Sequence, residues 1–95
     1  MRIFVVTYKL NQKNKDYSGL YAELEKTKTW WHYLESTWLL WTNETAKEIF
    51  DRLIPYIDNK DYLLIIEAGR DRNGWLPQKA WEWIDAGIAG ADKTL

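Results

Sequence analysis

The sequence predicts a small α+β domain in which helices cover one face of an antiparallel four-stranded sheet. Three observations lead to this prediction. Several short segments are rich in β-branched and aromatic residues, and two segments between them have the apolar spacing of amphipathic helices. The length of 95 residues suits one core, and the apolar fraction of 46% is that of a globular chain. Cysteine is absent, so disulfides, thiolate metal sites and a cysteine nucleophile are excluded.

The first strand is expected over residues 2–10, which are mostly β-branched and aromatic. One face of this strand carries Ile3 and Val5, and the other carries Phe4 and Val6. Apolar side chains on both faces are typical of a central strand that is covered on both sides.

A helix is expected next, capped by Asp16 or Ser18 and continuing to about Lys28. Its apolar side would carry Tyr17, Leu20, Tyr21 and Leu24. Residues 31–42 are strand-like throughout, and we divide them near residues 35–36 into two short strands or one sharply bent ribbon.

The second helix is expected after Asn43 or Thr45, because Thr45 and Glu48 have the spacing of a capping box. Pro55 should kink or close its last turn. The apolar positions of this helix follow one face: Ala46, Ile49, Phe50, Leu53, Ile54 and Ile57.

Residues 58–61 predict a turn, residues 62–67 a buried strand, and residues 69–74 a loop. Pro77 suits the first turn of a short terminal helix over residues 77–86.

The C-terminal residues 87–95 contain Gly87 and Gly90, and we expect them to fray. Residues 1–86 are therefore assigned to a single domain.

Two β-α-β crossovers packed together give a ferredoxin-like βαββαβ sandwich with a short C-terminal helix. The two helices of such a fold cover only one face of the sheet. Because the first and last strands are apolar on both faces, the second face needs the terminal helix or a partner, and a homodimer is the economical solution.

The strand ends carry a resemblance to a known family. The first strand ends Val-Val-Thr-Tyr-Lys-Leu, the middle segment reads Trp-His-Tyr-Leu-Glu-Ser-Thr-Trp, and the last strand reads Asp-Tyr-Leu-Leu-Ile-Ile-Glu. Residues 1–67 thereby resemble the ferredoxin-like CRISPR-associated adaptation nucleases (Cas-two) and their VapD-type toxin relatives, above all the stand-alone bacterial and phage members. The resemblance implies a symmetric dimer that pairs its sheets. It also matches Ser36 to a family serine, for which we expect a structural role at the bend.

The chain departs from this family at Lys9. In the nuclease members the first strand ends Tyr-Asp, and one carboxylate from each protomer is proposed to hold a divalent metal, whereas Tyr8 is followed here by Lys9. Two ammonium groups would repel a cation and each other. We therefore expect no metal site, no cofactor and no catalytic residue, and the chain more readily fits a non-enzyme.

Other candidate chemical groups have structural interpretations that we favour. His32 could act as a general base, but it lies between aromatic residues with no evident nucleophile, so packing is the better account. Asp58, Asp61 and Asp71 could bind a metal, but they lack the spacing of a calcium loop and suit turns instead.

The seven tryptophans exceed the needs of one small core: Trp30, Trp31, Trp38, Trp41, Trp75, Trp81 and Trp83. Tryptophan is enriched both at protein interfaces and at platforms on which single-stranded bases stack. The surrounding charge is mainly acidic, which favours the protein interface. We assign Trp38, Trp41 and Lys9 to it.

The formal net charge of −1 provides no whole-protein attraction to nucleic acid. Basic residues are nevertheless unevenly distributed, and the candidates for phosphate contact are Lys13, Lys15, Arg70 and Arg72. They would form a modest patch only if the two loops lie on the same edge. Solvated loops are the alternative.

The leading hypothesis is a non-catalytic, Cas-two-like homodimer that binds or assembles a nucleic acid or a partner protein. The alternatives are a small VapD-type nuclease, and a phage or defence accessory protein that engages another protein. No apolar run reaches the roughly 20 residues of a membrane span, and the N-terminus lacks the layout of a signal peptide, so a cytoplasmic location is expected.

Overall fold

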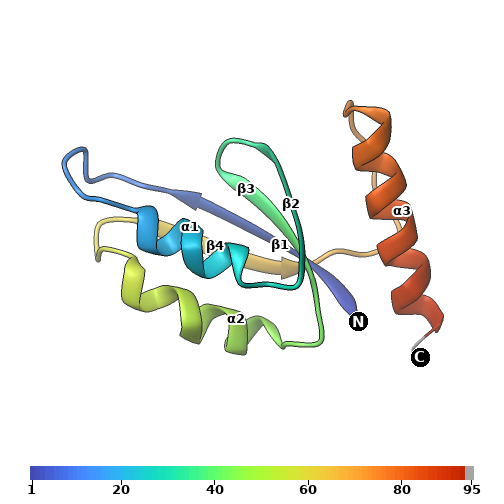
Figure 1. Ribbon diagram of the computed structural model, residues 1–95, viewed down its shortest axis with the longest axis horizontal. Coiled ribbons are helices and arrows are strands. Elements are labelled where there is room, and N and C mark those ends of the chain that lie inside the picture. The colour runs from blue at the N-terminus through green and yellow to red at the C-terminus, as the bar shows by residue number, and fades with distance from the viewer. Residues whose placement is uncertain (94–95) are drawn as a thin grey trace.

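The computed structural model describes the backbone of residues 1–93 and the side chains of residues 1–90. The chain is an α+β structure with the predicted order of elements (Figure 1). The elements are β1 (Arg2–Lys9), α1 (Ser18–Glu25), β2 (Thr29–Leu34), β3 (Thr37–Thr42), α2 (Ala46–Leu53), the 3-10 turn η1 (Ile54–Tyr56), β4 (Tyr62–Glu67) and α3 (Gln78–Lys93).

The four strands form one antiparallel sheet in the order β2-β3-β1-β4. β1 is central, as its two apolar faces predict, and β2 and β4 are the edges. Helices α1 and α2 lie side by side over one face, whereas α3 stands at one end of the sheet and packs against β1 (Figure 1). We call the face opposite α1 and α2 the open face.

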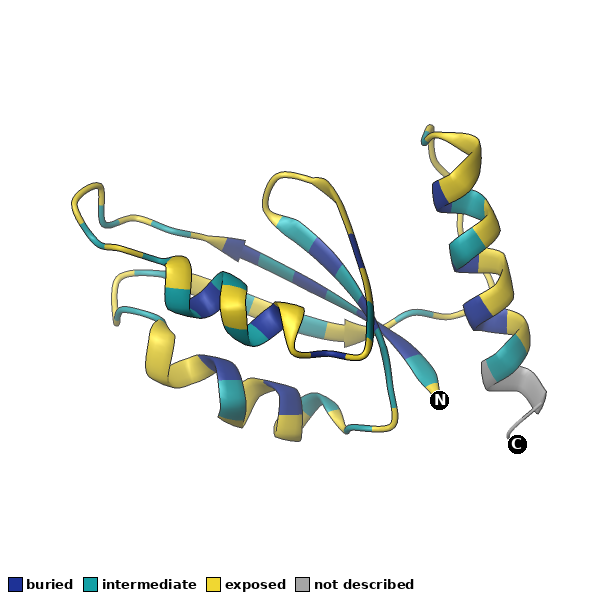
Figure 2. Cartoon of the chain, in the orientation of Figure 1, coloured by how far each residue is buried: buried dark blue, intermediate teal, exposed yellow. Residues whose placement is uncertain are grey.

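The main core lies between the sheet and the first two helices. Phe4, Val6 and Tyr8 of β1 point into it together with Trp38 and Leu40 of β3. The helices contribute their buried positions, Leu20, Leu24, Ile49 and Leu53. Figure 2 shows buried bands on both α1 and α2. Residues opposite one another in the register share a face, so Phe4 with Leu40 and Val6 with Trp38 belong to this core.

Most local signals in the sequence are confirmed. Thr45 and Glu48 form the predicted capping box, and Pro55 lies in η1, which closes the last turn of α2. The chain reverses at residues 35–36 between β2 and β3, as expected. The first helix ends at Glu25 rather than near residue 28. Its N-cap is Tyr17, which makes no side-chain cap, in place of the expected Asp16 or Ser18, although Asp16 accepts the N–H of Ser18 at 2.9 Å.

The terminal helix is longer than predicted, because residues 87–93 continue α3 instead of fraying. The helix continues through Gly87 and Gly90. A Cβ at Gly87 would collide with the side chain of Ile3, and one at Gly90 would lie 3.2 Å from Cζ2 of Trp41. The two glycines therefore let the helix backbone approach the sheet closely. Residues 94 and 95 of the predicted tail lie outside the described residues.

The expectation that residues 62–67 form a buried strand is half wrong. β4 forms over the predicted residues, but it is an edge strand, and Tyr62, Leu64 and Ile66 are exposed on the open face. Burial within the described residues therefore does not account for the apolar composition of this strand.

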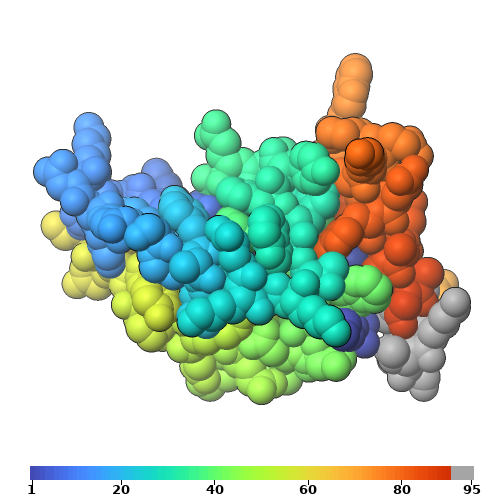
Figure 3. Space-filling view, viewed as in Figure 1, coloured from blue at the N-terminus to red at the C-terminus, as the bar shows by residue number. Residues whose placement is uncertain are grey.

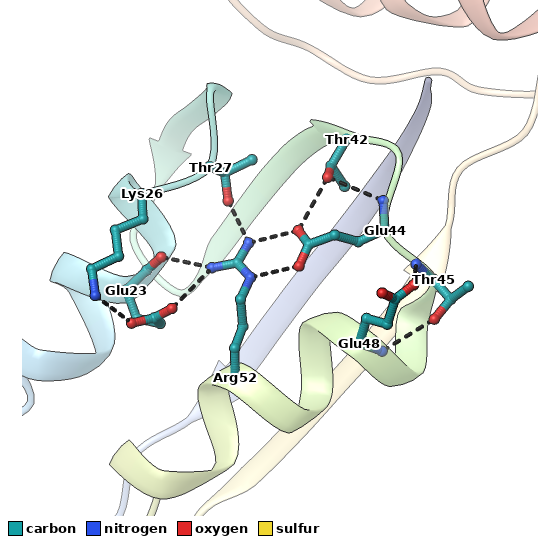
Figure 4. Close-up of polar contacts among 8 residues, drawn as sticks. All are labelled: Glu23, Lys26, Thr27, Thr42, Glu44, Thr45, Glu48 and Arg52. Atoms are coloured by element: carbon teal, nitrogen blue, oxygen red, sulfur yellow. Dashed lines mark hydrogen bonds and ion pairs between the residues drawn. The ribbon is translucent and has the colours of Figure 1, made fainter.

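An arginine holds the two helices and the β3–α2 connection together (Figure 4). Arg52 of α2 donates to both carboxylate oxygens of Glu44, at 2.9 and 3.0 Å, and to the backbone oxygen of Glu23, at 2.7 Å. It also donates to the hydroxyl of Thr27, and Thr42 donates to Glu44. Every charged group of this cluster has a partner, so its role is structural.

Candidate protein interface on the open face of the sheet

The open face is formed by alternate residues of the strands. Val5 lies between Leu39 and Ile66, and the next row places Thr7 between its two neighbours Thr37 and Leu64. The last row pairs Lys9 with Tyr62. Strand pairing thus brings these side chains together from segments far apart in the sequence.

The terminal helix covers only one end of this face. Ile84 and Ile88 of α3 pack on Ile3, with Trp41 and Trp83 beside them. Figure 2 shows the buried bands of α3 on its sheet side, and the space-filling view shows this helix against one end of the molecule (Figure 3). The rest of the open face has no layer over it among the described residues.

Beyond α3 the open face exposes apolar side chains. Tyr62 is 70% exposed, and Leu64 and Ile66 are each 53% exposed. A shallow hollow of about 320 Å³ lies beside them and is lined by Thr7, Tyr8, Lys9, Tyr62, Leu63 and Leu64. We define the open patch as Val5, Thr7, Lys9, Tyr62, Leu64 and Ile66. Contiguous exposed apolar surface of this kind marks interaction sites.

The polar groups of the open patch are few. The hydroxyls of Thr7 and Thr37 lie 3.1 Å apart, and the Thr7 hydroxyl donates to the backbone oxygen of Ser36. That carbonyl also accepts the N–H of Tyr8, so the segment at Ser36 ties the β2–β3 bend to β1. Lys9 stands at the rim and is exposed. The strand side chains on this face include no carboxylate in the described part of the chain.

Two of the three residues expected at an interface, Trp38 and Trp41, are not part of the open patch. Trp38 is 2% exposed and lies in the main core, where its indole N–H donates to the Tyr8 hydroxyl at 3.1 Å. It has almost no exposed surface, because it packs with the core residues of α1 and α2 and the His32 ring stacks on it. Burial raises the pKa of the Tyr8 phenol, despite the opposing hydrogen bond from Trp38.

Trp41 is on the open face but under α3. It packs edge-on against Trp83, with ring centres 6.4 Å apart. Its indole N–H and that of Trp31, on the same face, are buried without a hydrogen-bond acceptor in the described structure. Of the three expected residues, Lys9 alone lies at the open patch.

The basic residues do not form one patch. Lys13 and Lys15 follow β1, whereas Arg70 and Arg72 follow β4, and these strands run in opposite directions. The two loops therefore lie at opposite ends of the sheet (Figure 1). Arg72 is also engaged within the chain, because it donates to Asp85 at 2.7 Å.

The loop carboxylates Asp58 and Asp61 have structural partners, as the sequence indicates for turn residues, and Asp58 accepts the N–H of Lys60 at 3.0 Å. Asp61 accepts the N–H groups of Asn11 and Asp58, at 2.7 and 2.9 Å, and the Tyr17 hydroxyl. Although partial desolvation opposes it, these hydrogen bonds lower the pKa of Asp61. Among the side chains of residues 1–90, no three acidic or imidazole groups gather in a way that could hold a metal ion.

His32 has a packing role in the structure. Its ring stacks on Trp38, with centres 4.0 Å apart and planes 14° from parallel, and its Nε2 lies 2.9 Å from the backbone oxygen of Glu35.

Sequence reasoning did not select Tyr62, Leu64 and Ile66 as site residues. The sequence did carry a signal for them, because residues 62–66 are apolar on both faces of the strand. We interpreted this pattern as burial, although an edge strand with an uncovered face has the same composition.

Comparison with protein-family models, with curated proteins and with solved structures gives no match for this chain. None of the helices in the described part is sufficiently long and apolar to span a bilayer.

Proposed function

We propose that this chain is a non-catalytic, homodimeric binding or assembly module whose two copies meet through the open patch. The observation that carries the proposal is the exposed apolar row of β4, Tyr62, Leu64 and Ile66, beside a sheet face that α3 leaves uncovered. Exposed apolar side chains on one contiguous face are stabilised when a second surface excludes water from them.

A second copy suits this surface because the patch is almost free of charge. A two-fold interface brings each residue near its own symmetry mate or an exchanged neighbour, so like charges at its centre would repel. Only Lys9 is charged, and it lies at the rim beside Tyr62. By contrast, the α1–α2 side presents exposed acidic and basic groups.

The strand order supports a ferredoxin-like sandwich for the fold, since the two crossovers place β3 between β1 and β2, and β1 between β3 and β4. The proposal that the chain is related to the Cas-two and VapD-type proteins depends on the sequence motifs given above. If it is related to them, it differs in chemistry, because Lys9 is at the end of β1 and no strand carboxylate faces the open side.

We therefore propose that the purified protein does not cleave RNA or DNA in a magnesium- or manganese-stimulated reaction. A divalent metal shared between copies at the open patch would need anionic oxygen ligands, and the patch offers two ammonium groups instead. The nuclease alternative would gain support from metal-dependent cleavage that disappears when one particular Asp or Glu is replaced. We also propose that the dimer binds a ligand, which is a nucleic acid or another protein.

Sedimentation velocity at micromolar concentration tests the dimer. The wild-type chain should sediment as a dimer, and Ile66→Lys should shift it to a monomer, because the substitution places a charge within the apolar row. Phe50→Lys is the matched control: Phe50 is an exposed apolar residue on α2, away from the open face. A wild-type monomer, or equal dissociation in both variants, would contradict the proposal.

A further inference from the structure

A second hollow lies on the opposite side of the sheet from the open patch. It is open to solvent, measures about 330 Å³, and is formed between α1 and the β2–β3 hairpin. Its lining residues are Tyr21, Glu25, Trp30, His32, Glu35 and Trp38. Figure 3 shows α1 and this hairpin as neighbouring parts of one surface. The volume is at the lower end of the roughly 300–1,000 Å³ typical of small-molecule sites.

Aromatic rings form the walls of this hollow. Trp38 is buried, with His32 stacked on it and the Trp30 ring centre 5.0 Å away. Trp30 is 39% exposed, so its indole retains surface that the protein does not cover. A partly exposed indole is the aromatic side chain that attracts a cation most strongly.

Among the described residues, the acidic groups that line the hollow are two carboxylates, and the imidazole of His32 lines it with them. Glu25 comes from the end of α1 and Glu35 from the bend between β2 and β3. Neither side chain makes a hydrogen bond or ion pair to another of the described residues, whereas the nearby Glu23 and Glu44 are paired with Lys26 and Arg52. Glu23 and Glu44 thus stabilise the fold, whereas the carboxylates of Glu25 and Glu35 are available to a ligand.

We propose that this hollow binds a small organic cation, namely an ammonium group carrying alkyl substituents. The alkyl groups would contact Trp30 and Tyr21, while the positive charge would face the indole and the two carboxylates. A bare inorganic cation would gain little from aromatic walls, and a neutral apolar molecule would gain nothing from the carboxylates. The hollow therefore favours a ligand that has both a positive charge and apolar groups. This proposal does not depend on dimerisation through the open patch.

Titration by nuclear magnetic resonance, following the indole N–H signals, tests the site. The probes are tetramethylammonium chloride, tert-butanol as a neutral molecule of similar shape, and ammonium chloride at the same ionic strength. Tetramethylammonium should move the Trp30 signal in a saturable manner and bind about 5- to 30-fold more tightly than either comparison probe. Equal responses to tetramethylammonium and tert-butanol, or to tetramethylammonium and ammonium, would overturn the proposal.

Two sets of variants assign the contributions. Trp30→Leu should weaken tetramethylammonium binding about 5- to 30-fold, while Trp75→Leu, at a residue 99% exposed in the loop before α3, should not change it. If Trp30→Leu disturbs the fold, the carboxylate variants decide instead. Glu25→Gln with Glu35→Gln should weaken binding, whereas Asp71→Asn with Glu82→Gln removes the same charge elsewhere and should leave binding unchanged. Equal binding by both double variants would overturn the proposal.

Discussion

Gly87 provides a sensitive test of how α3 is held on the sheet. In the structure its missing Cβ would collide with Cδ1 of Ile3 and lie 3.0 Å from Cγ1. Ile3 is 1% exposed, so its side chain cannot swing away freely. Gly87→Ala therefore combines two opposing effects: a gain of about 1 kcal/mol in helix propensity and an overpacking cost of about 1–3 kcal/mol. We expect a net loss of about 1 kcal/mol.

Denaturation in urea at one fixed protein concentration, followed by tryptophan fluorescence, measures this change. Ile3→Val removes Cδ1 and should cost about 1 kcal/mol alone. In the Gly87→Ala protein the same change relieves the collision, so the double variant should be about 1 kcal/mol more stable than the sum of the single effects predicts. Gly69→Ala is the control, because no atom lies within 4 Å of its added Cβ. A stabilising Gly87→Ala that adds independently to Ile3→Val would refute the close packing of α3.

Three further predictions concern the Arg52–Glu44 ion pair and the positions of the basic loops. Arg52→Leu should lower the free energy of unfolding by about 2 kcal/mol, because it removes the partner of Glu44 and a donor to the Glu23 carbonyl; an unchanged urea midpoint would contradict this. Burial opposes ionisation of Glu44, but the hydrogen bonds and charge of Arg52 outweigh it and lower its pKa below the ordinary 4.5. Its contribution to stability should therefore be complete above pH 4.5 and lost as the pH falls through the lower folded-state pKa, and Glu44→Gln should flatten the stability curve there; identical curves would refute the assignment. Lys13 and Lys15 are at the opposite end of the sheet from Arg72, so one nucleic acid should contact only one of these ends. In fluorescence anisotropy titrations, the slope of the logarithm of the binding constant against the logarithm of the salt concentration should therefore be no steeper than about −2. A slope near −4 would show that both ends act together.

The order of elements was predictable because each depends on local chemistry. The capping box at Thr45 and Glu48, the proline that closes α2 and the reversal at residues 35–36 are all set by neighbours in sequence. These signals do not require knowledge of what packs on top.

The assignment of side chains to faces was harder, because β1, β3 and β4 are apolar at both parities. Alternation identifies which residues share a face, but it does not show which face the helices cover. Trp38 and Trp41 were both expected at an interface, and the structure places one under α1 and α2 and the other under α3. The glycines of α3 were misleading for a related reason, since close approach to a partner and local flexibility use the same residue.

The candidate site depends on long-range placement, which a single sequence shows least. The loops with Lys13 and Arg72 are separated because β1 and β4 are antiparallel neighbours. Conversely, Val5 and Ile66 are remote in sequence and adjacent on the open face. Only the strand order determines these two outcomes.

The most direct test of the central claim is an isotope-filtered nuclear Overhauser experiment on a mixture of labelled and unlabelled chains. Such a measurement detects only contacts between copies. The account predicts signals between copies from the methyl groups of Val5, Leu64 and Ile66. An absence of such signals at concentrations where the chain is a dimer, or signals that arise instead from the α1–α2 side, would contradict the open patch as the dimer interface.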